Sequence, residues 1–275
     1  DPTSEVATMG CRTRVISNIR NPQWETSHGR GNTSFVTINL PRLGILADHN
    51  INVFYDLLNE QLFRCVGVLM HRVEVVGKRS AADQPFLFGN KIWLASRDIS
   101  PRSLYELYLK ELNGVDLNSI PSDSEVDNFI LSIEDCKDVN ISALERAYKK
   151  YWSCQEEWIK DGSLSIGFIG LAECLIALTG KHHGESTDSQ TLGLEIVRHM
   201  RNVCDNLAES LKLNFSLLGT PAEGLSGRFI AIDKEKFGEI PGVTDKEYYT
   251  NSNHVPVDYK ISIADKIKIE SPYHE

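Results

Sequence analysis

Residues 163–170 read Ser-Leu-Ser-Ile-Gly-Phe-Ile-Gly, an apolar run that ends in a glycine-rich turn. This pattern predicts a buried strand, and residues 171–179 predict a helix directly after it, ended by Gly180. The order continues, because an amphipathic helix is predicted over 191–211 and a further strand over 213–219. Strands that alternate with helices favour an α/β architecture with parallel strands, in which functional residues lie where strands end in loops.

The region before this unit also contains a strand and a helix. β-branched and polar residues alternate over 33–40, which predicts a strand that Pro41 ends. Residues 51–73 carry apolar side chains at helical spacing and predict a long amphipathic helix. A short strand is predicted at 13–16, within an N-terminal stretch that otherwise favours loops.

Residues 100–155 differ in character and predict three short helices with acidic connections. Ser122-x-x-Glu125 and Ser142-x-x-Glu145 each have the spacing of a capping box at a helix start. We therefore expect a helical insert within the α/β framework.

The chain has 275 residues, a net charge of −9 and 41% hydrophobic residues. This composition excludes wholesale disorder, and the acidic balance argues against direct nucleic-acid binding through a broad basic surface. No apolar run approaches the roughly 18 residues that a membrane span needs, and residues 1–5 do not form a secretory signal. The scattered cysteines fit a reducing compartment, so a cytoplasmic location is expected. Because the chain begins without Met and stops after 271–275 with no charged tail, we expect it to be a piece of a longer polypeptide.

Two N-terminal segments carry candidate chemistry. Cys11 lies between Gly10 and Arg12, and a thiol beside cations on such a loop is typical of an activated thiolate; the alternative is a buried cysteine at a turn. Residues 29–33 read Gly-Arg-Gly-Asn-Thr, in which the glycines permit close approach to a ligand and Asn32 offers both a donor and an acceptor. Local sequence alone favours a plain turn before the strand for the second segment.

Three further segments have a functional and a structural interpretation. The glycines of 165–170, and the segment 220–224 after the next strand, could present backbone N–H groups to a phosphate at a helix start. Close packing of helix on strand is the alternative for both. The pair His182 and His183 suggests a metal, but a polar loop that closes the preceding helix is favoured, and no metal site is predicted.

Together these segments resemble the anaerobic, glycyl-radical (class III) ribonucleoside-triphosphate reductases. The resemblance is carried by six segments in the family's order: MGCRTRV at 9–15, GRGNTSFVTINLPRLGI at 29–45, QPFLFGNKIWL at 84–94, SLSIGFIGLAECLIALTGKHHGES at 163–186, NFSLLGTPAEGLSGRF at 214–229 and PGVTDKEYYTNSNHVPV at 241–257. It implies an α/β fold that is part of a ten-stranded α/β barrel. Residues 1–99 would hold the finger loop and the start of the second half-barrel, 100–155 the helical insert, and 156–275 the remainder of the half-barrel.

The resemblance also implies roles for single residues. Cys11 matches the cysteine whose thiyl radical abstracts the 3′-hydrogen of the substrate ribose, and Asn32 matches an asparagine beside the ribose hydroxyls. The substrate and its phosphates would lie near a set of loop and strand-end residues: Gly31, Ser165, Gly167, Phe168, Ile169, Gly170, Thr220, Pro221, Ala222 and Glu223.

The cofactors and partners implied by the family lie mostly outside this chain. They are a glycyl radical, a zinc site and bound ATP or dATP effectors, with formate as the reductant. The expected partners are ribonucleoside triphosphates, a radical-SAM activating enzyme and a second copy in a homodimer. The chain alone would then be inactive.

Two alternatives stay open at this point. One is another glycyl-radical enzyme of the pyruvate formate-lyase type, which would share the barrel and the radical cysteine. The other is a non-catalytic half-barrel that only binds nucleotides. The sequence does not give the base preference, the allosteric behaviour or the role of 100–155.

Overall fold

The structure is a computed structural model. It describes a subset of the chain: residues 7–9, 13–15, 18–20, 22, 31–78, 101–114, 121–134, 139–144, 146–147 and 160–274. Within these residues, β3 (Asn32–Asn39), β4 (Ser163–Ile169) and β5 (Asn214–Gly219) form a parallel sheet in the order β3-β4-β5. The predicted α/β architecture with parallel strands is confirmed for this part of the chain.

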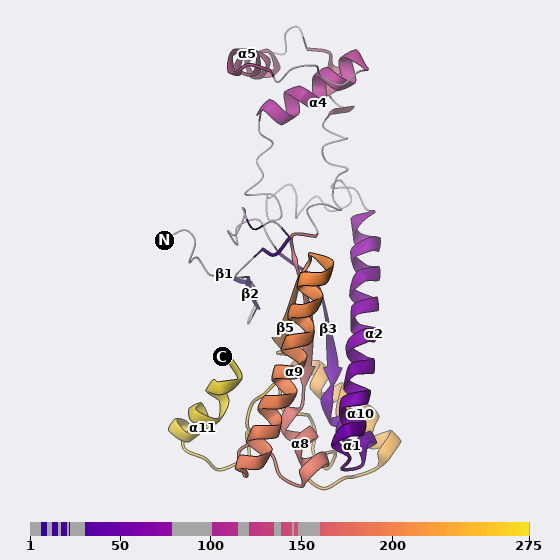
Figure 1. Ribbon diagram of the computed structural model, residues 1–275, viewed down its shortest axis with the longest axis vertical. Helices are drawn as coiled ribbons and strands as arrows, with labels where there is room; N and C mark the ends of the chain where they lie inside the picture. The colour runs from indigo at the N-terminus through magenta and orange to yellow at the C-terminus, as the bar shows by residue number, and fades with distance from the viewer. Residues whose placement is uncertain are drawn as a thin grey trace.

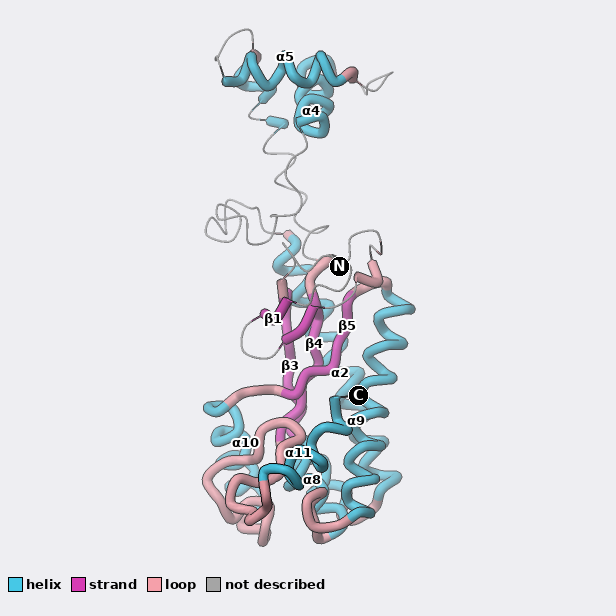
Figure 2. The backbone as a smooth tube through the Cα atoms, turned by 90° about the vertical axis from the view of Figure 1, so that its left-hand side faces the viewer, coloured by secondary structure: helices cyan, strands magenta, loops and turns pink. Residues whose placement is uncertain are grey.

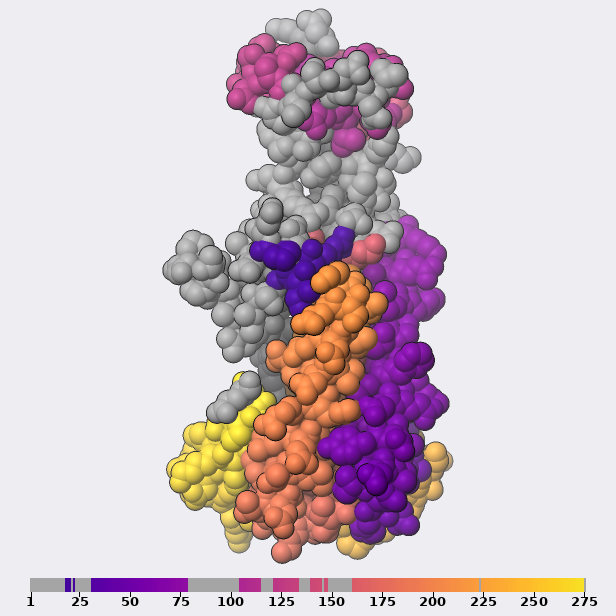
Figure 3. Space-filling view, viewed as in Figure 1, coloured from indigo at the N-terminus to yellow at the C-terminus, as the bar shows by residue number. Residues whose placement is uncertain are grey.

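Two long helices, α2 (Ile51–Gly77) and α9 (Thr187–Leu211), lie along one face of this sheet (Figures 1 and 2). Two short helices, α1 (Leu40–Ala47) and α8 (Leu171–Thr179), follow β3 and β4 directly and pack at the carboxyl ends of the strands. Alternate strand residues such as Ile38, Ile166 and Phe215 point into the core beneath them. The side chains of α2 and α9 form a continuous outer surface in Figure 3. The other face of the sheet carries the hydroxyl groups of Thr37, Ser165 and Ser216, together with the exposed ring of Phe35.

A second apolar cluster lies at the carboxyl end of β4. It joins Ile169 to Tyr249 and to Ile230 of α10 (Glu223–Phe237). After α10 the chain returns across this end of the sheet before α11 (Ile263–Glu270) and the 3₁₀ helix η3 (Ser271–His274). The strand ends and the returning segment therefore share one packed region.

The predicted elements occur within a few residues of their expected limits, but α1, α10 beyond its start, α11 and η3 were not predicted. The strand does end beside Pro41, as expected, yet a helix starts there because proline suits the first helical turn. Asn39 provides the cap, since its side-chain oxygen accepts a hydrogen bond from Arg42 N at 3.3 Å. The N-terminal strand β2 (Thr13–Val15) pairs with an unpredicted strand β1 (Ala7–Met9).

The region 100–155 contains helices with a small core of their own (Figure 1). α4 (Pro101–Asn113) and α5 (Asp123–Glu134) pack through residues that include Tyr108 and Phe129. Glu125 accepts a hydrogen bond from Ser122 N at 2.8 Å, as a capping box requires.

The predicted capping box at Ser142 is wrong. Asn140 caps this helix instead, because its side chain accepts a hydrogen bond from Ala143 N at 3.0 Å and helical structure begins at residue 141. Among the described residues, no helix is both long enough and apolar enough to cross a membrane.

Loss of the cap of α2 should weaken the fold by a small, measurable amount. The side-chain oxygen of Asn50 accepts hydrogen bonds from Asn52 N at 3.0 Å and Val53 N at 3.2 Å. We expect Asn50→Ala to lower the free energy of unfolding by about 1 kcal/mol, measured by urea denaturation. Asn52→Ala, an exposed change in the same turn, is the control, and an equal loss in both variants would contradict the prediction.

Candidate functional site

Hydroxyl groups line the sheet face that the helical layer leaves free. Ser165 Oγ lies 2.9 Å from Ser216 Oγ, and Thr37 Oγ1 lies 3.1 Å from Thr220 Oγ1. Gly167 sits between the threonines, and a Cβ there would lie 2.0 Å from Thr220 Oγ1. A side chain at Gly167 would therefore displace Thr220. The structure thus brings together Ser165, Gly167 and Thr220, which the sequence placed in one site.

Phe168 and Ile169 lie differently from the hydroxyl-bearing residues. The Phe168 ring is buried in the core beneath the helices, so its backbone alone reaches the strand end, where its carbonyl accepts from Thr220 N at 3.2 Å. Ile169 packs in the cluster at the carboxyl end of β4. Gly170 follows with φ of 79°, a left-handed conformation that favours glycine.

Asn32 lies at the other end of β3. Its partner in register is Ser163, and the carbonyl of the buried Gly31 accepts a hydrogen bond from Ser163 N at 2.9 Å. At roughly 3.3 Å per residue, the ends of β3 are about 20 Å apart, so Asn32 does not adjoin the 220–223 loop. Asn32 Oδ1 is buried without a hydrogen-bond partner in the described part of the chain.

An open groove of about 610 Å³ runs along β3 and connects these two regions. Asn32 and Thr37 both line it, together with Arg72 of α2 and Leu225 and Phe229 of α10. Arg72 Nη1 donates to the Phe35 carbonyl at 2.8 Å, which fixes the arginine at the sheet edge. Asn32 and Thr37 thus line the same groove, and Thr220 contacts Thr37 beside it.

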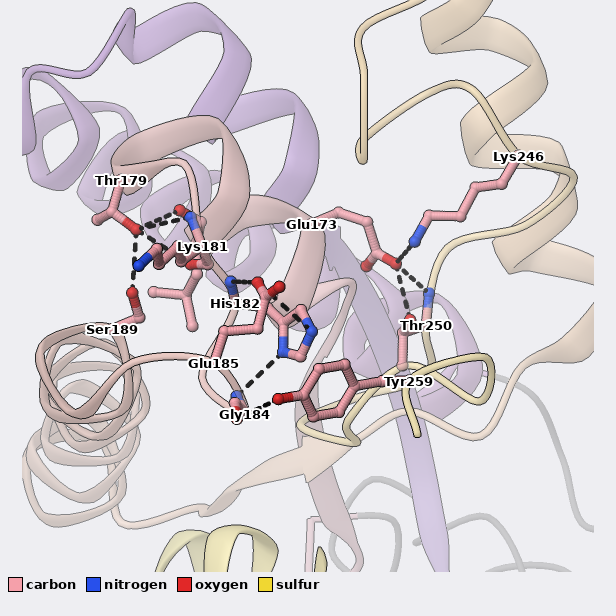
Figure 4. A network of polar contacts seen from close by, with 11 residues as sticks. Glu173, Thr179, Lys181, His182, Gly184, Glu185, Ser189, Lys246, Thr250 and Tyr259 are labelled. Atoms are coloured by element: carbon pink, nitrogen blue, oxygen red, sulfur yellow. Dashed lines mark hydrogen bonds and ion pairs between the residues drawn. The ribbon is translucent and has the colours of Figure 1, made fainter. Parts of the chain in front are cut away.

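The start of α8 is occupied by the chain's own oxygen atoms (Figure 4). Gly170 N donates to Thr250 O at 2.8 Å and Leu171 N donates to Ser252 O at 3.2 Å. The fully buried Glu173 carboxylate accepts from Thr250 N at 3.1 Å and from Thr250 Oγ1 at 2.7 Å, and it pairs with Lys246 at 2.6 Å. A phosphate at this helix start would lie against a carboxylate and two carbonyl oxygens, which do not donate hydrogen bonds, so the start of α8 does not suit an anion.

The start of α10 offers a more open N-terminus. Ala222 is the N-cap, and no side chain of the described residues caps the helix there. A Cβ on the exposed Gly224 would meet no described atom within 4 Å. Backbone N–H groups at such a helix start bind anions well. Of the two predicted phosphate sites, the geometry favours the one at 220–223.

The segment 249–253, which the sequence analysis used for the family resemblance but to which it gave no role, crosses the carboxyl ends of the strands. The Tyr249 hydroxyl donates a hydrogen bond to Asp233 of α10 at 2.9 Å, and the Thr250 hydroxyl donates one to Glu173. Asn251 pairs with Ile169 in an isolated antiparallel β-bridge. The run of small polar residues that follows two tyrosines could have marked this segment as a candidate site. The role of the segment could not be predicted, because it depends on contacts between distant parts of the chain.

The two histidines do not form the expected polar, cationic loop. Both side chains are buried, and His183 Nε2 donates to the Asn253 carbonyl at 3.0 Å. Burial, aided by the neighbouring His182, lowers the pKa of His183 to about 4, so its ring is neutral at pH 7. In the described ranges, no three His, Cys, Asp or Glu side chains are grouped to hold a metal ion. Cys11, the predicted radical cysteine, lies outside the described residues.

We predict that lowering the pH from 7 to 5 destabilises the fold through His183. In the unfolded chain, the His183 ring takes up a proton near the ordinary histidine pKa of about 6.5. In the folded chain, the same ring stays neutral until the pH falls to about 4. The contribution of His183 is therefore complete above about pH 6.5 and is lost as the pH falls towards 4. The expected loss between pH 7 and pH 5 is about 2 kcal/mol.

Chemical denaturation of the protein and of His183→Gln at both pH values measures this loss. The variant should lose about 2 kcal/mol less on acidification, because it lacks the group that titrates. His71→Gln, which removes an exposed histidine from α2, should behave like the parent protein. Equal pH dependence in the parent and in His183→Gln would refute the assignment.

Comparison with known proteins identifies relatives over nearly the whole chain. A family model described as anaerobic ribonucleoside-triphosphate reductase matches residues 1–112 and 128–275, so it leaves out 113–127 of the predicted insert. The anaerobic ribonucleoside-triphosphate reductase of Escherichia coli (strain K12) is 31% identical over 269 residues, which cover 96% of this chain and 30% of that protein. Its counterpart in Enterobacteria phage T4 is 30% identical over 275 residues, covering 98% of this chain and 35% of that protein.

A solved structure shows the same fold. The anaerobic ribonucleotide reductase from Thermotoga maritima in complex with dATP and CTP is similar with a TM-score of 0.52 and 14% identity, over 87% of this chain and 30% of that one. The mixed helix and strand arrangement with a small parallel sheet therefore matches this class of structures. The chain spans about a third of the length of the curated relatives it matches.

Proposed function

Because the chain belongs to the family of anaerobic ribonucleoside-triphosphate reductases, we propose that it forms part of the catalytic barrel of such an enzyme. The observation that carries the proposal is the family match over nearly all of the chain, which includes the positions of Cys11 and Asn32. The sheet β3-β4-β5 would belong to a ten-stranded barrel completed by other parts of the protein, with 1–99 contributing the finger loop. This match favours a reductase over an enzyme of the pyruvate formate-lyase type.

The proposed reaction converts a ribonucleoside triphosphate into its deoxy form at Cys11. The cysteine, as a thiyl radical, takes the hydrogen atom from C3′ of the ribose, and the resulting carbon radical eases the departure of the 2′-hydroxyl as water. A proton completes the water, and formate, oxidised to carbon dioxide, supplies the two electrons and the hydrogen that replaces the hydroxyl at C2′. Cys11 then returns the hydrogen atom to C3′, which restores the thiyl radical. A glycyl radical elsewhere in the protein would supply the oxidising equivalent that generates the thiyl radical.

Asn32 and the groove along β3 would position the substrate for this step. Asn32 Oδ1 is buried and has no hydrogen-bond partner among the described residues, so it suits a ribose hydroxyl donor, and it adds no charge beside a radical. The groove leads from Asn32 past Thr37 towards Thr220. The triphosphate would then reach the open N-terminus of α10, where the helix dipole favours negative charge.

The proposal extends to groups and partners outside this chain. The glycyl radical, the zinc site and the sites for ATP or dATP effectors would be carried by the remainder of the polypeptide, and this chain alone would not turn over. A radical-SAM enzyme would generate the radical, and the full enzyme would act as a homodimer in the cytoplasm.

The direct test is ribonucleotide reduction by the full-length protein. The protein is activated anaerobically, supplied with formate and a ribonucleoside triphosphate, and the deoxynucleotide is measured by chromatography. Formation of deoxynucleotide that depends on formate would support the proposal. A stable glycyl radical without any deoxynucleotide would overturn it and favour a small-acid substrate.

A further inference from the structure

The segment 249–253 holds buried amide atoms that no described residue satisfies. Asn253 is 4% exposed, and its Nδ2 finds no hydrogen-bond partner among the described residues. The same is true of Oδ1 of Asn251, two residues earlier. Leaving a buried polar atom unpaired is costly, and folded proteins keep few of them without a reason. A bound ligand is one such reason.

Asn253 is fixed at the base of the loop that leads into α10. Its Oδ1 lies 3.6 Å from the position that a Cβ on Gly219 would take, and Thr220 follows directly. On its other side, the Asn253 carbonyl accepts a hydrogen bond from the buried His183 at 3.0 Å. The neighbouring Ser252 is tied by its carbonyl to Leu171 N at 3.2 Å. The backbone is therefore held in place while the amide group lies against the strand end.

We propose that Asn253 donates a hydrogen bond from Nδ2 to a phosphate oxygen of the nucleotide bound at the N-terminus of α10. This rests on the proposed function and adds a residue to its phosphate site. The helix start supplies the positive end of a dipole without a side-chain cap. Asn253 supplies, from a different segment of the chain, a donor that no described residue uses. The start of α8 is closed by Thr250, Ser252 and Glu173, so of these two helix starts α10 is the one that is open to an anion.

The test measures nucleotide binding by the full-length protein with CTP and with cytidine as probes, by equilibrium dialysis. Asn253→Asp places a carboxylate where the donor was, and we expect its Kd for CTP to rise about tenfold or more. Asn253→Ala should raise it severalfold. The Kd for cytidine, which has no phosphate, should stay within about twofold in both variants. Asn202→Asp, the same change on the exposed face of α9, is the matched control and should bind CTP as the parent does.

The outcomes separate this proposal from the proposed function. No CTP binding by the parent protein would overturn the proposed function and this proposal with it. CTP binding that is unchanged in both variants would overturn the role of Asn253 alone. An equal loss of affinity for CTP and cytidine would show that Asn253 supports the fold rather than the phosphate, and would also overturn it. If the melting temperature of Asn253→Asp shows that this variant fails to fold, the ratio of the Kd for CTP to the Kd for cytidine in Asn253→Ala tests the proposal. A ratio equal to that of the parent would overturn it.

Discussion

A Cys11→Ser variant of the full-length protein is expected to form no detectable deoxynucleotide, while its glycyl radical still forms. Serine preserves the size and polarity of the side chain, so the change isolates the sulfur. The O–H bond of an alcohol is much stronger than the S–H bond of a thiol, so a stable carbon radical cannot open it. Without a radical at residue 11, the 3′-hydrogen of the ribose is not abstracted.

Two measurements on the same anaerobic sample check this expectation. Electron paramagnetic resonance quantifies the glycyl radical, and chromatography quantifies the deoxynucleotide. Cys65→Ser is the control, since burial raises the pKa of Cys65 to about 11 and this cysteine packs against the core of the helical layer. The control should retain activity. Deoxynucleotide formed by Cys11→Ser at the parent's rate would remove Cys11 from the mechanism.

The alternation of strands and helices could be predicted because hydrophobic periodicity is a local property of the sequence. The runs at 163–170 and 213–219 predicted β4 and β5, and the helical spacing in 191–211 predicted α9. The helix α1 was missed because Pro41 suggests the end of a strand as readily as the start of a helix. The barrel that would enclose this sheet stays a prediction, because it depends on residues outside those described.

The site was predicted in part for the same reason. Glycines and threonines at strand ends mark loops, so Gly167 and Thr220 were found, and the structure places them in contact distance. Which helix start is open could not be predicted. That depends on Thr250 and Ser252, which reach the start of α8 from far along the chain. Asp233 was missed because it precedes Lys-Glu-Lys in the sequence, a pattern typical of an exposed helix surface.

Asp233 holds together the elements around the strand ends. Its carboxylate is fully buried and accepts from Arg42 Nε at 2.6 Å, from Asn39 Nδ2 at 2.7 Å and from the Tyr249 hydroxyl at 2.9 Å. These donors come from the start of α1, the end of β3 and the segment 249–253. Burial, followed by the nearby Asp233 charge, raises the pKa of Tyr249, so its hydroxyl keeps its proton and serves as the donor.

Asp233→Ala is therefore expected to lower the free energy of unfolding by about 3–5 kcal/mol, the range for removing one partner of a buried ion pair. The loss is large because the buried Tyr249 hydroxyl and the Asn39 amide lose their acceptor along with Arg42. Glu235→Ala removes the same charge from an exposed position of α10 and should change stability by less than about 0.5 kcal/mol. Urea denaturation at pH 7 measures both variants. A loss in Asp233→Ala as small as that in Glu235→Ala would mean that the network does not anchor α10. The proposed phosphate site requires an anchored α10, because the N–H groups at its start would bind an anion only if the helix keeps its place against the strand ends.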